Sequence, residues 1–169
     1  MRSLIAVLAA MATLASPAFA DTPKEAKDFA DKVTVATKFE IDTSELALKY
    51  AKSAEVKAFA QQMIDDHTKA GEEFKAALKE ANIEPPMNML DATHTAKYAK
   101  LRVFTTEKSF EPAYVTEQLK AHEEAVATFK DYAQNGGTPA LKTFAEKTLP
   151  TLEHHLAMIK DIDAKTPKS

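Results

Sequence analysis

The sequence predicts an all-α protein, built as a four-helix bundle with one short extra helix that crosses over between two helical hairpins. Glycine occurs only three times in 169 residues, and no segment alternates apolar and polar residues as a half-buried strand does. Apolar residues instead recur every three or four positions along four long segments. Residues typical of helix starts and ends flank these segments, and they predict where each helix begins and ends.

The first two long helices are expected at Pro23–Lys52 and Ala54–Ala81. Proline is well suited to the first turn of the first helix, and Ser53 can cap the N-terminus of the second. The second helix should end ahead of Glu84-Pro85-Pro86, because consecutive prolines cannot continue a helix.

A short helix follows, with Asp91 as its cap and its end near Phe104. Ser109 is the expected cap of the next long helix, in which Pro112 is tolerated because it falls in the first turn. That helix should close at Asn135-Gly136-Gly137, a C-cap and turn signal.

The last helix is expected at Pro139–Asp163 and contains Pro150, which should bend it or open its hydrogen-bond ladder. We expect the final residues from Lys165 to be frayed. No low-complexity linker divides the chain, so residues 21–169 should form a single domain.

Residues 1–20 have the features of a cleaved secretory signal. Arg2 precedes an apolar run from Leu4 to Leu14, and Ala18-Phe19-Ala20 places small residues where signal peptidase requires them. The mature chain would then start at Asp21 and lack a transmembrane segment, since no later run has the necessary length. A retained N-terminal anchor is the alternative.

Composition excludes several classes of function. The chain has no cysteine, which rules out disulfides, thiolate metal sites and thiol catalysis. Its formal charge of −3 does not favour binding to nucleic acid or anionic membranes. No nucleophile elbow, phosphate loop, zincin helix or glycine fingerprint occurs. We therefore assign no catalytic or cofactor-binding residue, and a non-enzymatic role is favoured.

The segment Ile64-Asp65-Asp66-His67-Thr68-Lys69 places charges in the middle of the second helix. At 100° per residue, His67 falls inside the apolar stripe of that helix, Asp66 lies on its margin, and Asp65 points to solvent. The histidine is therefore expected to face the core.

Each of the other long helices also has one strong ligand type in its stripe. Glu40 takes this position in the first helix, His122 in the fourth and His155 in the last, whereas His154 faces outward. Glu111 lies on the same face as His122, three turns earlier. Buried groups of this kind need partners, because an unpaired one costs several kcal/mol.

The positions of Glu40, His67, His122 and His155 along the bundle axis allow their side chains to meet. Glu40 lies 13 residues before the turn residue Ser53 and His67 lies 14 after it. His122 lies 14 residues before Gly136 and His155 lies 19 after it, an offset of about 7 Å at 1.5 Å per residue. Either a metal ion or a closed hydrogen-bond network would satisfy groups that converge in this way.

Three runs of sequence carry a resemblance to a known family: FEIDTSELALKYAKSAEVKAFAQQMIDDHTKA, FEPAYVTEQLKAHEEAV and LKTFAEKTLPTLEHHLAM. They resemble the bacterial exported ferritin-like proteins grouped as domain of unknown function 4142, over roughly Lys27–Ile162. The resemblance implies a ferritin-like bundle in the periplasm and no established activity.

The family's motifs correspond to residues of this chain one by one. Its first-helix glutamate is Glu40, its Asp-His pair is Asp66 and His67, and its later histidines are His122 and His155. Its Phe-Asp-x-x-Tyr motif corresponds to Phe110, Glu111 and Tyr114, with Glu111 where the family usually has aspartate. Its Leu-Pro-Thr-Leu motif is Leu149–Leu152.

Di-iron chemistry is not expected, because di-iron bundles place a glutamate three residues before each core histidine. Ile64, Leu119 and Leu152 occupy those positions here. The similar spacing of Asp91 and His94 falls on the short helix, where we interpret Asp91 as a cap. A mononuclear histidine-rich site for zinc, copper or iron suits the ligand types better.

We therefore predict a periplasmic bundle that binds one transition-metal ion and serves metal storage, sensing or stress response. The candidate ligands are Glu40, Asp66, His67, Glu111, His122 and His155. One alternative is a structural or interaction module in which the same groups form a hydrogen-bond network. Another is a binder of a small organic ligand, with Tyr114 as a polar contact. Met87 and Met89, in the proline loop, suggest a soft-metal or hydrophobic contact.

Overall fold

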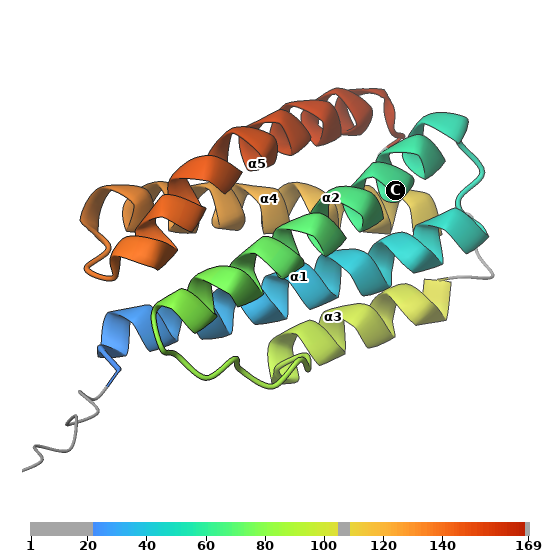
Figure 1. Cartoon of the computed structure of the whole chain (residues 1–169). Helices are drawn as coiled ribbons and strands as arrows, with labels where there is room; N and C mark the ends of the chain where they lie inside the picture. Colours follow the sequence, from blue (N-terminus) through green and yellow to red (C-terminus); the bar gives the residue numbers. More distant parts are fainter. Residues whose placement is uncertain (1–21, 105–108, 168–169) are drawn as a thin grey trace, which may run out of the picture.

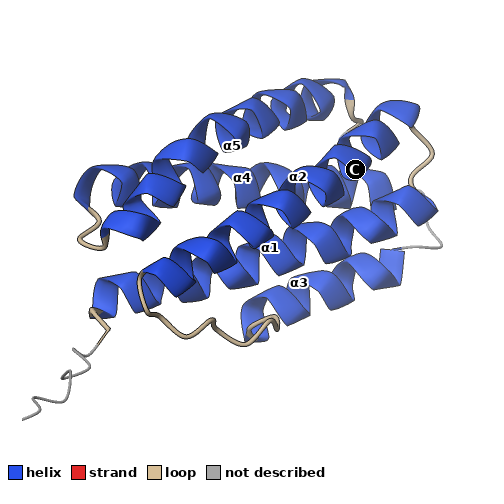
Figure 2. Cartoon of the chain, in the orientation of Figure 1, coloured by secondary structure: helices blue, strands red, loops and turns tan. Residues whose placement is uncertain are grey.

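The computed structural model describes residues 22–104 and 109–167, which form five helices and no strands (Figures 1 and 2). The all-α prediction is confirmed for this part of the chain. The expected signal peptide at residues 1–20 lies outside the described residues. None of the described helices combines the length and apolar character that a membrane span requires.

The helix bounds agree with the expected ones to within two residues. The five helices are α1 Lys24–Tyr50, α2 Ala54–Glu80, α3 Ala92–Val103, α4 Phe110–Asn135 and α5 Pro139–Lys165.

The four long helices form a closed ring. α1 packs on α2, α2 on α5, α5 on α4 and α4 on α1, while the short helix α3 packs on α1 and α4. Figure 1 shows α3 running along the outside, from the end of the bundle where α2 finishes to the end where α4 starts. The fold is therefore a helical bundle of two hairpins joined by a crossover helix.

Two of the three expected caps form. Ser53 Oγ accepts a hydrogen bond from the Val56 amide at 3.3 Å, and Asp91 Oδ1 accepts one from the His94 amide at 2.7 Å. The prediction that Ser109 caps α4 was wrong, because its backbone is helical (φ −86°, ψ −6°) and its side chain makes no capping bond. Capping side chains reach the helix from an extended residue.

The proline inside the last helix does not end it. α5 continues through Pro150 to Lys165, although proline cannot donate to the carbonyl of Glu146. The two loop methionines are exposed, Met87 by 79% and Met89 by 54%. They contribute nothing to the core.

Buried apolar side chains form two clusters, one toward each end of the bundle. The first includes Phe29, Val33, Phe74, Leu78, Phe129, Leu141, Phe144 and Leu152. The second includes Ala47, Val56, Phe59, Met63, Phe110, Tyr114, Val115, Ile159 and Ile162. Along every long helix, buried polar residues stand between the members of the two clusters: Glu40, Thr43, Ser44, His67, Gln118, His122 and His155. The core is thus interrupted by a polar layer at mid-bundle.

Candidate metal centre

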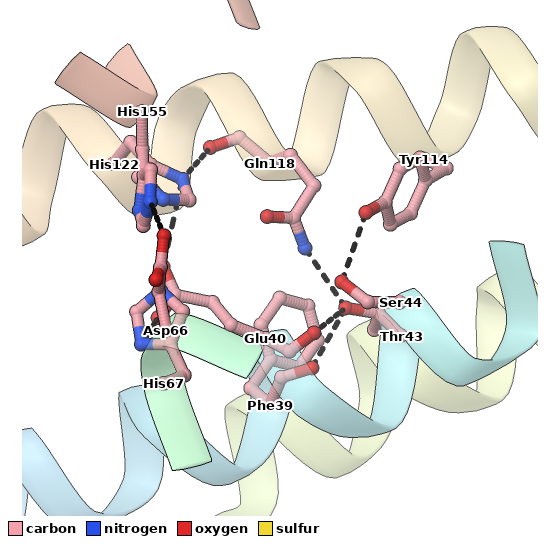
Figure 3. Close-up of polar contacts among 10 residues, drawn as sticks. All are labelled: Phe39, Glu40, Thr43, Ser44, Asp66, His67, Tyr114, Gln118, His122 and His155. Atoms are coloured by element: carbon pink, nitrogen blue, oxygen red, sulfur yellow. Dashed lines mark hydrogen bonds and ion pairs between the residues drawn. The ribbon is translucent and has the colours of Figure 1, made fainter. Parts of the chain in front are cut away.

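Four helices each contribute one strong ligand type to the polar layer. Glu40 comes from α1, His67 from α2, His122 from α4 and His155 from α5, and none is more than 5% exposed. Apolar residues flank each of them at helical spacing, so burial of the neighbouring turns draws these side chains inward as well. The expected convergence of the four is observed (Figure 3).

The three histidines form a compact triangle. Their ring centroids are 6.0 Å apart for His67 and His122, and 5.6 Å apart for each of the other two pairs. One ligand nitrogen from each ring lies within 4.8 Å of the others. Ligands of a tetrahedral zinc ion, at about 2.1 Å from the metal, lie about 3.4 Å apart, so small inward ring movements would close this triangle on an ion.

Hydrogen bonds fix which nitrogen carries the proton in two of the rings. Nδ1 of His122 donates to the main-chain oxygen of Gln118 at 2.9 Å, and Nε2 of His155 donates to Oδ2 of Asp66 at 2.9 Å. A carbonyl or carboxylate oxygen can only accept, so the lone pairs are left on Nε2 of His122 and Nδ1 of His155. Nδ1 of His67 lies 3.4 Å from Glu40 Oε2, a contact rather than a hydrogen bond.

The remaining ring nitrogens have no hydrogen-bond partner. These buried atoms are His67 Nε2, His122 Nε2 and His155 Nδ1. His122 and His155 thus show the arrangement of metal-binding histidines, in which one nitrogen is free to face an ion and the other is held by a backbone carbonyl or a carboxylate.

Burial keeps the histidines in the neutral form that binds metals. It lowers the pKa of His67 to about 3 and that of His122 to about 4, with repulsion from the neighbouring rings as a further cause. The pKa of His155 is also lowered by burial, although the hydrogen bond to Asp66 opposes the shift. All three rings are therefore uncharged at neutral pH, each with a single ring proton.

Glu40 lies beside two of the rings and is itself uncharged at neutral pH. Its carboxyl oxygens are 3.4 Å from His67 Nδ1 and 3.5 Å from His122 Nδ1, and burial raises its pKa to about 8. Neutral glutamic acid next to neutral imidazole does not make an ion pair. A nearby cation would favour the carboxylate form and reverse this shift.

A second set of buried polar groups continues from Glu40 between α1 and α4, on the right of Figure 3. Gln118 Nε2 donates to Thr43 Oγ1 at 2.9 Å, and Thr43 Oγ1 donates to the Phe39 carbonyl at 2.7 Å. Ser44 and Tyr114 share a hydrogen bond of 2.9 Å. Tyr114, expected as a contact for an organic ligand, is thus fully buried and paired with a serine.

Five of the six predicted ligands lie together, in different positions. The three histidines surround the centre, Glu40 contacts two of them, and Asp66 lies behind His155 as its hydrogen-bond acceptor. Asp66 is therefore placed to orient a ligand, at the margin where the sequence put it.

Glu111 lies away from this cluster. Its Oε2 accepts hydrogen bonds from the amides of Lys52 (2.8 Å) and Ser53 (2.9 Å), in the turn between α1 and α2. Eleven residues separate it from His122, which is about 16 Å along a helix. A shared helix face does not imply a shared height.

Gln118 and Thr43 were not predicted as part of the polar layer. Gln118 precedes His122 by four residues and Thr43 follows Glu40 by three, so both occupy the same helix faces as those ligands. The structure buries Gln118 and Ala125 more deeply than their apolar neighbours Leu119 and Val126, so hydrophobicity alone does not mark the buried face of α4 here. Testing polar residues one turn from each candidate ligand would have found them.

Two solved structures resemble this fold. A DUF305 fragment from Deinococcus radiodurans superposes with a TM-score of 0.71 at 15% identity, covering 86% of this chain and 98% of that one. The structure described as CopM in the Cu(II)-bound form superposes with a TM-score of 0.68 at 20% identity, covering 81% and 94%. At these identities the likeness concerns the fold alone. No curated protein sequence matches the chain.

The resemblance expected from the sequence motifs is confirmed at the level of the family. The family model described as "Domain of unknown function (DUF4142)" matches residues 10–162. This range includes every helix except the last turn of α5, and all of the polar layer. The chain belongs to the DUF4142 family.

Proposed function

We propose that this protein binds a single transition-metal ion at the histidine triangle, with His67 Nε2, His122 Nε2 and His155 Nδ1 as ligands. The observation that carries the proposal is that three neutral, buried imidazoles meet, and each has at least one nitrogen without a hydrogen-bond partner. A buried polar atom left without a partner costs about 1–3 kcal/mol. An ion would satisfy all three nitrogens at once.

The ligand types favour zinc or copper. Three imidazoles suit Zn²⁺ and Cu²⁺, and they leave at least one coordination position for Glu40 or water. A metal ion beside Glu40 would favour its carboxylate form, which would offset one positive charge of the ion. Glu40 Oε1 is available for this role because it has no hydrogen-bond partner. The solved structure of CopM, described as Cu(II)-bound, supports testing Cu²⁺ first.

The biological setting we propose is that of an exported, ferritin-like bundle that handles metal in the periplasm. The signal-like residues 1–20 support export. The arrangement of two hairpins and a crossover helix supports comparison with ferritin-like bundles.

The direct test is titration of the purified, tag-free protein with Cu²⁺ and Zn²⁺. We expect one ion per chain, and nitrogen hyperfine structure in the electron paramagnetic resonance spectrum of the copper form. His67→Ala, His122→Ala and His155→Ala should each abolish tight binding, whereas the exposed neighbour His154→Ala should not. Equal binding by all four variants would refute the proposal.

A structural role is the second candidate, and one observation favours it. The Gln118–Thr43 and Ser44–Tyr114 hydrogen bonds join α4 to α1 without any ion. If the histidines belonged to this network, replacing them would destabilise the metal-free protein. The two roles therefore predict opposite effects on stability.

A further inference from the structure

A groove between α1 and α2 leads from the surface to the histidine triangle. It has a volume of about 320 Å³ and reaches His67. The other lining residues include Thr37, Asp42, Thr68, Gly71 and Pro86. His67 is also the most exposed of the three histidines, at 5% against 0% for His122 and 1% for His155.

Gly71 lies in this groove and has no structural explanation. It stands in the interior of α2, where glycine is less stable than alanine by about 0.5–1 kcal/mol. A Cβ atom at this position would meet no atom within 4 Å, so no close packing excludes a side chain. Its backbone is ordinary helix, so no special conformation requires glycine.

A side chain longer than that of alanine at position 71 would extend over His67. Gly71 follows His67 by four residues and therefore shares its face of α2. Helical side chains lean toward the N-terminus and cover the preceding turn. The missing side chain at residue 71 thus leaves the groove open in front of His67, the ring of which is itself buried.

We propose that this groove is the route by which the metal ion reaches and leaves the histidine triangle, and that Gly71 keeps it open. The inference rests on the proposed metal binding. An ion that enters through this groove meets His67 first, and His122 and His155 then complete its coordination.

The groove is lined by two lysines, Lys38 and Lys75, and two carboxylates, Asp42 and Glu72, and its remaining polar groups suit the passage of a hydrated cation. Threonine hydroxyls from both helices can hydrogen-bond to the water that an ion gives up: Thr34 and Thr37 on α1, and Thr68 on α2. Asp42 supplies a carboxylate, held by Lys38 at 2.9 Å. Pro85 and Pro86 form part of the rim, where their fixed backbone limits collapse.

A rival route exists on the opposite side of α2. A depression of about 260 Å³ is lined by Asp66, Lys69, Ala70 and Thr151, and by no histidine. Asp66 stands between this depression and His155. The adjacent positions Gly71 and Ala70 therefore face the two routes and provide a matched pair for substitution.

The test measures rates of Cu²⁺ binding and release. The chain has four tyrosines and no tryptophan, so stopped-flow quenching of tyrosine fluorescence reports association, and transfer to excess EDTA reports release. We expect Gly71→Leu to slow both steps by about tenfold and to leave the dissociation constant unchanged. Gly71→Gln provides the same obstruction with a polar side chain if the leucine variant does not fold. Ala70→Leu should leave both rates unchanged.

The possible results separate this inference from the proposed function. Unchanged rates in both position-71 variants would overturn the route, as would equal slowing by Ala70→Leu. Weaker binding by Gly71→Leu without slower release would also overturn it, because that pattern indicates a damaged site. Absence of Cu²⁺ binding by the unmodified protein would instead refute the metal site itself.

Discussion

Gln118 holds the ring of His122 through its main-chain carbonyl oxygen, which accepts the Nδ1 proton at 2.9 Å. Both residues belong to α4, so this bond requires no neighbouring helix. A carbonyl oxygen has two lone pairs and can accept this bond together with its helical one. The tautomer of His122 is therefore set within its own helix, which leaves the lone pair on Nε2.

Replacing His122 by leucine should raise the free energy of unfolding of the metal-free protein by about 1–2 kcal/mol. The substitution removes a buried nitrogen without a partner and introduces an apolar side chain of similar size. Urea unfolding in the presence of a chelator would measure the change, with the exposed His154→Leu as control. A loss of stability would favour the structural network over the metal site.

Asp66→Ala should weaken metal binding by about tenfold to a hundredfold. The substitution removes the acceptor for His155 Nε2 and leaves this ring free to rotate or change tautomer. Asp65→Ala is the matched control, because Asp65 points away and bonds to Gln61 on the surface. Isothermal titration would measure both affinities, and equal effects would show that Asp66 does not orient His155.

Stability of the metal-free protein should be greatest near pH 6.5. The pKa values of His67 and His122 in the folded state, about 3 and 4, lie below the ordinary 6.5. The unfolded chain therefore binds more protons as the pH falls below 6.5, and stability is lost. Glu40 has the opposite sign, because its folded-state pKa of about 8 exceeds 4.5 and its contribution is lost as the pH rises toward 8.

Between pH 4.5 and 6.5 the histidines outnumber Glu40, so acidification destabilises by about 1.4 kcal/mol per pH unit for each net proton. Above pH 6.5 only Glu40 contributes. Urea unfolding as a function of pH would test both limbs. Glu40→Gln should remove the alkaline limb, and persistence of that limb would contradict the assignment.

Glu111→Ala should destabilise the fold by about 1–3 kcal/mol and leave metal affinity unchanged. Its carboxylate accepts two amide hydrogen bonds in the α1–α2 turn and ties the start of α4 to that turn. Glu123→Ala, an exposed position on the same helix, is the control. A large loss of affinity without loss of stability would place Glu111 in the metal site.

Gly71→Ala should stabilise the protein by about 0.5–1 kcal/mol. Alanine has the higher helix propensity, and its Cβ would meet no atom within 4 Å. Gly136→Ala is the opposite case, because its Cβ would come within 2.5 Å of the Tyr132 carbonyl oxygen. Thermal unfolding would distinguish the two, and destabilisation by Gly71→Ala would show a packing constraint at that position.

The sequence predicted the helices and the inward direction of Glu40, His67, His122 and His155, because periodicity determines which face of a helix is buried. It also placed Asp66 at the edge of the core. Glu111 shares a face of α4 with His122, but the eleven residues between them separate the two by about 16 Å along the helix. A shared face gives only a direction about the helix axis, and the residue count, which gives the height, places Glu111 at the turn and away from the cluster.

The roles of individual ring nitrogens could not be read from the sequence. They depend on the carbonyl of Gln118 and the carboxylate of Asp66, and so on contacts of about 3 Å. Gly71 illustrates a different limit. A glycine within a helix is visible in the sequence, but its meaning depends on the space around it, which only the packed structure defines.

The polar layer draws on both hairpins, with Glu40 and His67 from one and His122 and His155 from the other. Along the chain, the segment that joins these hairpins contains α3, and no cysteine is present that could bridge them. An ion held by histidines of both hairpins would act as a removable cross-link between the two halves of the bundle. Binding of the ion would then add to the apolar packing and hydrogen bonds that already join the hairpins, and resistance to proteases would rise with the supply of metal.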